Sequence, residues 1–212
     1  ILNNENNSVL LFQYLYLNKI NFHFMNGNFS GGLYLVNEIE AGIERFHKKI
    51  DDNRIINFYY KIGCLYFGSG DNVNAIKYLN KVINHPAQIR GDIHSFSRIL
   101  KLIAHYEMGD TEMVEYQVKA VYRFLYKLEE LNQVQQQIIN FLRKVPVMDT
   151  VSVKKEFVKL RSSLIKLQQD PYEKRAFLYL DIISWLTCKI ENRSIQEVMR
   201  EKAINKSRII ND

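Results

Sequence analysis

The side chains best suited to ligate a metal or to transfer protons are five histidines, all in the first half of the chain. They form no His-Glu-x-x-His pattern and no close Cys/His pairing. Catalysis requires several titratable groups on one face of the fold. We therefore expect surface or interface histidines, and no ligand set, at His23, His47, His85, His94 and His105.

Acid–base, phosphate or thiol chemistry could use three further features, and each has a structural explanation. The carboxylates Asp51 and Asp52 precede a predicted helix, whose dipole favours negative charge at its start. The run Gly68-Ser69-Gly70 fits a turn between two helices rather than a phosphate loop. Cys64 and Cys188 are far apart in sequence, which predicts two inert buried thiols in a reducing compartment. The sequence thus predicts no enzyme, no cofactor and no metal site.

Helices must position the functional residues of this chain. The clearest helical pattern is in the stretch from Ile56 to Pro86. Tyr59, Ile62 and Tyr66 recur at steps of three and four residues, which predicts one apolar stripe. Gly70-Asp71 predicts the turn that follows. Glycine tolerates the left-handed conformation of a helix end, and aspartate can cap the next helix.

Small residues complete a known spacing within this stretch. Gly63 lies in an aromatic-x2-Ile-Gly-x2-Tyr segment, and Ala75 with Leu79 supplies an Ala-x3-apolar segment after the turn. Small side chains at these positions allow two antiparallel helices to approach closely. The whole unit resembles the tetratricopeptide repeat, a helix–turn–helix element that stacks into solenoids.

Looser copies of the unit flank it on both sides. Gly27-Asn28 and Gly109-Asp110 repeat the turn signal, while Asn21 and Ile103 occupy the position of Gly63. The turn glycines are farther apart than the roughly 34 residues of a standard tetratricopeptide repeat, which implies long helices. The resemblance is strict over residues 56–86 and looser over 11–129.

A broader span, from about residue 59 to residue 201, also resembles the C-terminal part of uncharacterised bacterial tetratricopeptide proteins. That resemblance implies the fold and no known activity. The segments that carry it are Ser97–Glu107, Tyr122–Leu125, Phe141–Lys144 and Asp181–Leu186.

These patterns predict an all-α fold, a right-handed α-solenoid of antiparallel helix pairs. Residues 1–130 are expected to form three tetratricopeptide-like pairs, and residues 131–212 a further pair with C-terminal capping helices, continuous with the first part. We expect Asn3 to Ser8 to be frayed. The expected helices are Val9–Asn26, Ser30–Lys49, one that Asp51-Asp52-Asn53 caps and that runs through Tyr66, Asn72–Asn84, Ala87–Met108, Thr111–Glu129, Leu131–Val145, Ser152–Gln168, one beginning at Asp170-Pro171, and Ser194–Lys206.

Apolar stripes are expected on most of these helices. The penultimate helix is apolar around most of its circumference, as a buried capping element of a solenoid would be. Its apolar residues are Phe177, Leu178, Leu180, Ile182, Ile183, Trp185 and Leu186. The stripes elsewhere include Leu11, Tyr14, Leu17, Ile20 and Phe24; Leu33, Val36, Ile39, Ile43 and Phe46; Val114, Val118, Val121 and Leu125; and Phe157, Leu160, Leu164 and Leu167.

Composition limits the classes of partner. The formal net charge of +6 permits contact with nucleic acid, but we expect solvated helix faces and no nucleic-acid partner. The densest basic stretch contains Lys144, Lys154, Lys155, Lys159, Arg161 and Lys166. No apolar run is long enough to cross a membrane and no signal peptide is evident, so we expect a cytoplasmic protein. Because the chain starts without methionine, we expect it to be a fragment of a longer protein.

The family resemblance implies a functional surface on the first helix of each pair. Asparagine amides there could bond the backbone of an extended peptide, and aromatic rings could anchor its side chains. The alternative is that these rings pack against the long helices and leave no groove. The peptide- or protein-binding candidates are Asn18, Phe22, Asn57, Tyr60, Phe67, Leu100 and Lys101, accompanied by Met25, Cys64, Ser97 and Ala104.

Three functional hypotheses follow. The first is a non-enzymatic scaffold or adaptor that binds a protein or peptide segment in this groove. The second is a regulatory or sensor domain attached to an absent N-terminal effector region. The third is weak nucleic-acid binding by the basic face. The partner's identity and the oligomeric state stay open.

Overall fold

The computed structural model describes residues 2–87, 89–128, 131–179 and 181–211. Within these ranges every regular element is a helix and no strand occurs, which confirms the all-α prediction. The helices in chain order are α1 (Leu2–Met25), α2 (Phe29–Gly32), α3 (Leu35–Arg45), α4 (Asp52–Ser69), α5 (Asn72–Ile83), α6 (Gly91–Glu107), α7 (Thr111–Lys127), α8 (Gln133–Lys144), the 3-10 turn η1 (Val145–Val147), α9 (Thr150–Leu167), α10 (Ala176–Tyr179), α11 (Ile182–Glu191) and α12 (Ile195–Asn211).

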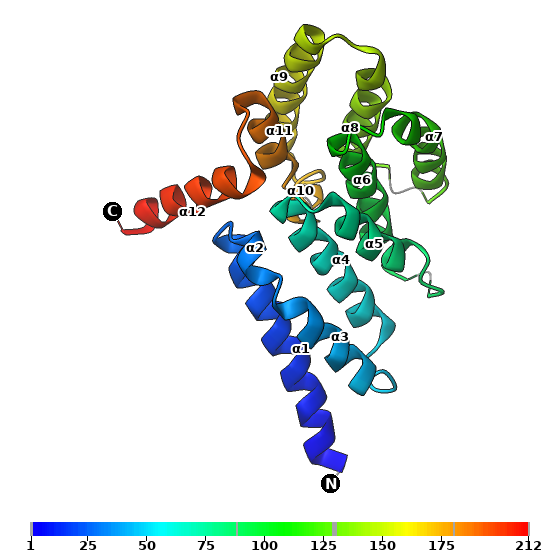
Figure 1. Ribbon diagram of the computed structural model, residues 1–212, viewed down its shortest axis with the longest axis vertical. Helices are drawn as coiled ribbons and strands as arrows, with labels where there is room; N and C mark the ends of the chain where they lie inside the picture. The colour runs from blue at the N-terminus through cyan, green and yellow to red at the C-terminus, as the bar shows by residue number, and fades with distance from the viewer. Residues whose placement is uncertain (1, 88, 129–130, 180, 212) are drawn as a thin grey trace.

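Each long helix from α4 to α9 packs against the next one along the chain (Figure 1). After α9 the order changes, because α11 returns onto α9 and α12 packs on both α11 and α4. In Figure 1 α1 forms one end of the molecule and the tips of α8 and α9 the other. The sequential packing of helices was predicted, whereas the return of the C-terminal segment to α4 was not.

The α4–α5 hairpin forms as its residues predict. Gly70 has φ of +88°, and the Asp71 side chain accepts a hydrogen bond of 3.0 Å from Asn74 N at the start of α5. A Cβ on Gly63 would lie 3.1 Å from the Leu79 side chain, so the missing side chain permits the close approach of the two helices. The predicted turn, cap and close contact are all confirmed.

The N-terminal pair differs from the prediction at two points. Residues Asn3 to Ser8, expected to be frayed, belong to α1. The expected helix from Ser30 to Lys49 is divided into α2 and α3 around Leu33 and Tyr34. There Leu33 N donates to Ser30 O and Val36 N to Leu33 O, a three-residue spacing that tightens the helix just after Gly31-Gly32.

The predicted helix at Asp170-Pro171 is wrong. The Asp170 carboxylate does accept a hydrogen bond from Tyr172 N, but residues 171–175 form turns rather than a helix. Glu173 instead caps a different helix, since its carboxylate accepts hydrogen bonds of 3.1 Å from the Gln133 and Val134 N–H groups of α8. A second cap, Asp181, starts α11 separately by accepting from Ser184 N. Two predicted residues, Glu129 and Leu180, lie outside the described residues.

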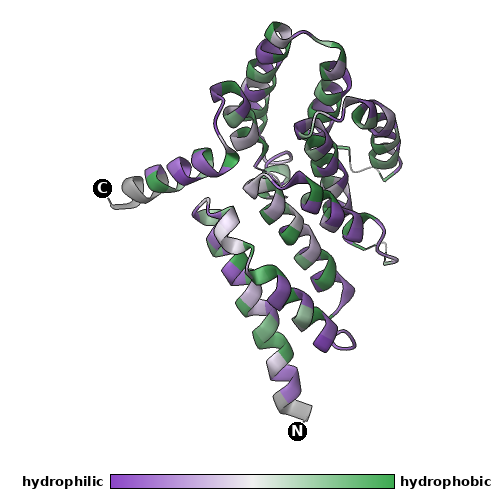
Figure 2. Ribbon diagram, in the orientation of Figure 1, coloured by the Kyte–Doolittle hydropathy of each residue, from purple (hydrophilic) through white to green (hydrophobic). Residues whose placement is uncertain are grey.

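Two apolar clusters form the core, and α4 contributes to both. Phe58, Ile62 and Leu65 pack with α1–α3, whereas the α4 residues Ile56 and Tyr60 pack with the later helices. The predicted inner stripes of α7 and α9 are buried, apart from Leu167, which is half-buried. On the first helix Leu17 and Ile20 are buried, but Leu11 and Tyr14 are exposed. Figure 2 accordingly shows hydrophobic residues around much of the middle of α1.

Candidate functional site

The C-terminal segment covers the part of the predicted groove that belongs to α4 and α6. Tyr60, Phe67 and Leu100 are buried, and a cavity that they line has residues Phe177 to Tyr179 on its other side. The Tyr60 hydroxyl donates a 2.7 Å hydrogen bond to the carbonyl oxygen of Tyr179. Tyr60 therefore contacts the chain's own C-terminal segment, and Phe67 and Leu100 share a cavity with it.

Tyr179 is held on its other side by the start of α6. Its ring stacks on Phe96 with centroids 5.0 Å apart, and its hydroxyl donates to Asp92 Oδ2. The Arg90 guanidinium donates to both oxygens of Asp92, at 3.0 and 3.1 Å. Arg175 adds an ion pair with Asp92 at 3.6 Å. This cluster is a clamp that fixes α10 against α6.

The electrostatics of the clamp favour an ionised Asp92. Burial raises the pKa of this carboxyl, but hydrogen bonds from Arg90 and Tyr179 outweigh the effect and the pKa lies below its ordinary value. Sequence reasoning did not find Asp92 or Tyr179. The two residues lie 87 positions apart, and neither belongs to a local motif that marks a tertiary contact.

A cavity of about 280 Å³ remains between α4 and the C-terminal segment. Aromatic rings from both sides line it, including Phe24, Phe29, Phe67 and Trp185. Asn57, Tyr60, Phe67 and Leu100 of the predicted groove are all among its lining residues. Four of the seven predicted binding residues therefore converge on one cavity.

Lys61 brings a positive charge to this apolar cavity. Its ammonium donates a 2.7 Å hydrogen bond to Asn21 Oδ1 and lies 5.3 Å from the centroid of the Phe24 ring. Burial lowers the pKa of Lys61. Among the described residues Lys61 has no carboxylate partner. The sequence pattern gave no reason to single it out.

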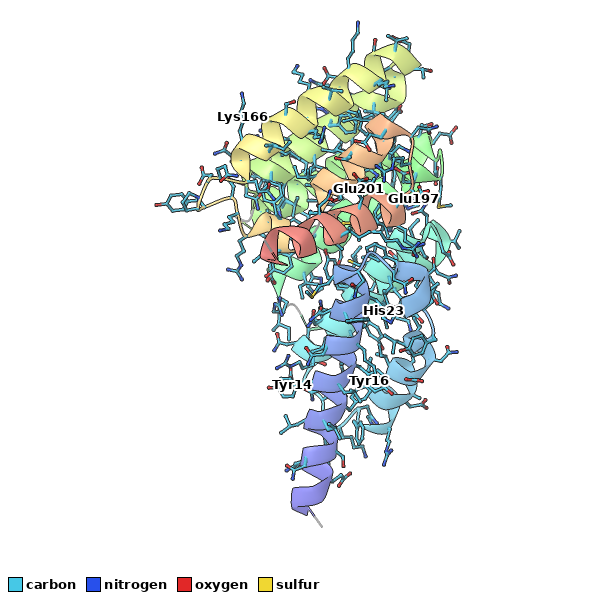
Figure 3. The ribbon with its side chains drawn as sticks, turned by 90° about the vertical axis from the view of Figure 1, so that its left-hand side faces the viewer. Tyr14, Tyr16, His23, Lys166, Glu197 and Glu201 are labelled. Atoms are coloured by element: carbon cyan, nitrogen blue, oxygen red, sulfur yellow. The ribbon has the colours of Figure 1, made fainter. Side chains whose placement is uncertain are left out.

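Helix α12 borders the cavity through Ile195 and Met199 and also reaches the turn after α1. The Ser30 N–H donates a 2.8 Å hydrogen bond to Gln196 Oε1, from the far end of the chain. Gly27 adopts φ of +58°, and a Cβ on it would lie 2.5 Å from the backbone nitrogen of Arg200. Glycine is required here for both its conformation and its size. In Figure 3 α12 passes over the upper end of α1, above His23.

The part of the groove predicted on α1 stays open. Phe22 and Met25 are 66% and 74% exposed, and Asn18 is exposed between them and Leu15. With Leu11, 66% exposed, these residues recur at alternating steps of four and three along one face, which we call the α1 stripe. Figure 3 shows α1 uncovered along this side of the molecule, with Tyr14 and Tyr16 projecting in different directions.

The remaining groove candidates on α6 are not open. Ser97 and Ala104 are buried, and Lys101 is half-buried. Burial, and next the charge of Arg98, lower the pKa of Lys101. Arg98 lies 3.5 Å from the centroid of the Phe124 ring, a cation–π contact between α6 and α7. These cations therefore lie within the packing of adjacent helices.

Cysteine and histidine side chains are the most reactive groups that the sequence analysis considered. Burial raises the pKa of the Cys64 and Cys188 thiols to about 12, which keeps both protonated, although Cys64 is only half-buried. Of the five histidines, which were expected at surface or interface positions, His94 and His105 are buried and His47 is exposed. Across the residues described, no group of three or more His, Cys, Asp or Glu side chains could hold a metal ion.

The basic stretch on α9 carries solvated charges. Lys154, Lys155, Lys159 and Lys166 are exposed, and Lys166 points away from the body of the molecule in Figure 3. Lys159 has an ion pair with Glu156 at 3.6 Å, one turn away. The arrangement is that of an ordinary solvated helix face.

Comparison of the chain with protein-family models, with curated proteins and with solved structures finds no match. None of the described helices combines the length and the apolar character needed to span a bilayer.

Proposed function

We propose that this chain is a non-enzymatic protein-interaction module that presents the α1 stripe to a helical segment of a partner protein. Four of the stripe's five residues are large and apolar, and they are 42% to 74% exposed. Contiguous exposed apolar surface of this kind marks sites of protein association. This stripe is the observation that carries the proposal.

The geometry of the stripe favours a helix as the bound segment. Leu11, Leu15, Phe22 and Met25 follow the spacing with which one helix face meets another, and Asn18 supplies one amide in the middle. An amphipathic helix laid along α1 would continue the helix-on-helix packing of the later elements. This interpretation keeps the tetratricopeptide-like solenoid as the architecture that we propose.

Site-specific crosslinking tests the assignment. A photoreactive phenylalanine analogue replaces Phe22 in one protein and Tyr116, which is 80% exposed on α7, in a matched control. We expect the first to crosslink one partner through a peptide with amphipathic helical periodicity, and the second not to. Crosslinks at residue 116 alone, or at neither residue, would contradict the proposal. Nucleic acid recovered independently of residue 22 and removed by salt would favour the basic face of α9 instead.

The Phe22→Ser/Met25→Ser variant provides a second readout. It should abolish partner recovery without loss of folding, because both side chains are exposed and contribute little to the core. Tyr116→Ser/Val147→Ser is the matched control, since these side chains are 80% and 81% exposed outside the stripe. Equal loss of the partner in both variants would rule out the stripe as the specific surface.

A second candidate function is a regulatory or sensor domain within a larger protein. The observation that favours it is the cavity between α4 and the C-terminal segment, because residues from opposite ends of the chain line it. A ligand in such a space would alter how firmly the C-terminal segment is held. This role is compatible with a protein partner on α1.

A further inference from the structure

The cavity between α4 and the C-terminal segment has the composition of a small-molecule site. Its walls are predominantly aromatic and aliphatic, with Phe24, Phe67, Trp185 and Met199 among them. Binding sites for small ligands are typically concave and apolar, with a few polar groups that fix orientation. Polar groups are present here in Asn57 and Lys61.

The two charged side chains that line the cavity, Asp181 and Lys61, differ in their partners. Asp181, the carboxylate that lines it, accepts from Ser184 N at 3.1 Å and has an ion pair with Lys202 at 2.6 Å. Lys61 has the neutral Asn21 amide oxygen as its hydrogen-bond acceptor, at 2.7 Å. An ammonium group has three donors, so a ligand acceptor could satisfy more of them. An anionic ligand would therefore complement the positive charge of Lys61.

We propose that this cavity binds a small apolar monocarboxylate, with the carboxylate at Lys61 and the hydrocarbon body among the rings of both walls. The cavity volume of about 280 Å³ suits such a ligand, since an apolar cavity of roughly 150 Å³ already accepts benzene. None of the five residues of the α1 stripe lines this space. The proposal is thus independent of protein binding on α1 and can fail separately.

A ligand bound in this cavity would also bridge α4 and the C-terminal segment. Asn57, Lys61 and Cys64 form one wall on α4, while Phe177, Ile195 and Met199 belong to the C-terminal segment. A ligand that contacts both walls binds the closed arrangement and not one in which the C-terminal segment has separated. It therefore stabilises the closed form by mass action.

The chain carries its own reporter for this site. Trp185 is the single tryptophan of the sequence and lines the cavity. We would titrate the 212-residue chain with ω-bromooctanoate, whose bromine quenches an indole on contact, and follow Trp185 fluorescence. Octanoate, 1-octanol and octyltrimethylammonium would then be compared as competitors. We expect saturable quenching that octanoate reverses and that the neutral and cationic analogues reverse poorly.

Variants separate charge recognition from nonspecific adsorption. Lys61→Met keeps most of the aliphatic stem and removes the charge, so affinity should fall about tenfold to a hundredfold. Lys48→Met, on an exposed side chain away from the cavity, is the matched control and should bind as the wild type does. Cys64→Leu, which adds bulk to the wall while keeping Lys61, should also weaken binding. Circular dichroism checks that each variant is folded.

Three results would each overturn the proposal. No quenching up to the solubility limit of the acid would overturn the proposal, as would equal affinity of the Lys61→Met and wild-type proteins. Equal competition by octanoate and octyltrimethylammonium would show surfactant-like adsorption and would overturn it too. None of these outcomes bears on crosslinking at Phe22.

Discussion

The Tyr60 hydroxyl on α4 donates a 2.7 Å hydrogen bond to the main-chain carbonyl of Tyr179, a residue 119 positions further along the chain. The bond lies in the part of the groove that the sequence assigned to an external peptide. A main-chain carbonyl of the protein's own C-terminal segment is the acceptor there. The C-terminal segment thus occupies a surface that could otherwise receive an extended ligand.

Removing that hydroxyl should loosen the C-terminal segment. We expect Tyr60→Phe to lower the free energy of unfolding by about 1–2 kcal/mol, since it leaves a carbonyl without its partner. Amide hydrogen exchange should accelerate in α10–α12 more than in α7. Tyr116→Phe, which alters an exposed hydroxyl, is the control. Equal exchange in both variants would show that the bond does not hold the segment.

A comparison of two turn glycines separates the strain of a positive φ angle from the cost of an overlap with α12. Gly70→Ala places a side chain at φ of +88° with no heavy atom within 4 Å, so strain alone should cost about 1–2 kcal/mol. Gly27→Ala adds an overlap with the α12 backbone to a similar strain at φ of +58°. Urea denaturation should show a larger loss for Gly27→Ala. Equal losses would mean that α12 moves aside without cost.

The clamp around Asp92 should stabilise the fold at neutral pH, and this contribution should be lost in acid. Because the folded-state pKa lies below the ordinary value, this contribution is present above the unfolded-state pKa and is lost as the pH falls through the folded-state value. Asp92→Asn should cost roughly 1.5–3 kcal/mol at neutral pH. Its unfolding free energy should also decline less steeply than that of the wild type on acidification. An unchanged acid profile would contradict the assignment.

His94 should produce a second pH dependence, at less acidic pH. Burial, then the neighbouring Arg98 charge, lowers its pKa from the ordinary 6.5, and its Nε2 is buried without a hydrogen-bond partner among the described residues. The neutral ring's contribution to stability is full above 6.5 and is lost as the pH falls through the folded-state pKa. Urea midpoints measured between about pH 5 and pH 8 should fall on acidification, and His94→Gln should flatten this trend.

His47→Gln, on an exposed histidine, serves as the control for that measurement. Its midpoints should follow those of the wild type across the same range. A trend flattened equally by both substitutions would remove His94 as the cause.

Local chemistry made most helix boundaries predictable. Asp51 and Asp71 cap α4 and α5, and Gly70 and Gly109 have the positive φ angles expected at helix ends. Each of these signals acts within a few residues of the chain, so a sequence pattern contains it in full. Apolar periodicity likewise predicted which faces of α7 and α9 are buried.

The groove could not be predicted in the same way. Tyr60, Phe67 and Leu100 were assigned by position within a repeat, and no local feature indicates that residues 177–179 lie opposite them. The turns at residues 171–175 and the separate start of α11 accompany the roles of Glu173 and Asp181 as caps of α8 and α11. The first of these depends on a contact 40 residues away in the chain. Exposure of the α1 stripe depends in turn on what packs beside α1.

The hydrogen bond between Ser30 N and Gln196 Oε1 joins residues 166 positions apart. In an open array of repeats each unit contacts only its neighbours, so unfolding can start at one end and proceed stepwise. Contacts of this range raise the contact order of the chain, which slows folding relative to a purely local helical array. They also make the two ends of the chain depend on each other, so the molecule should unfold cooperatively rather than stepwise from one end.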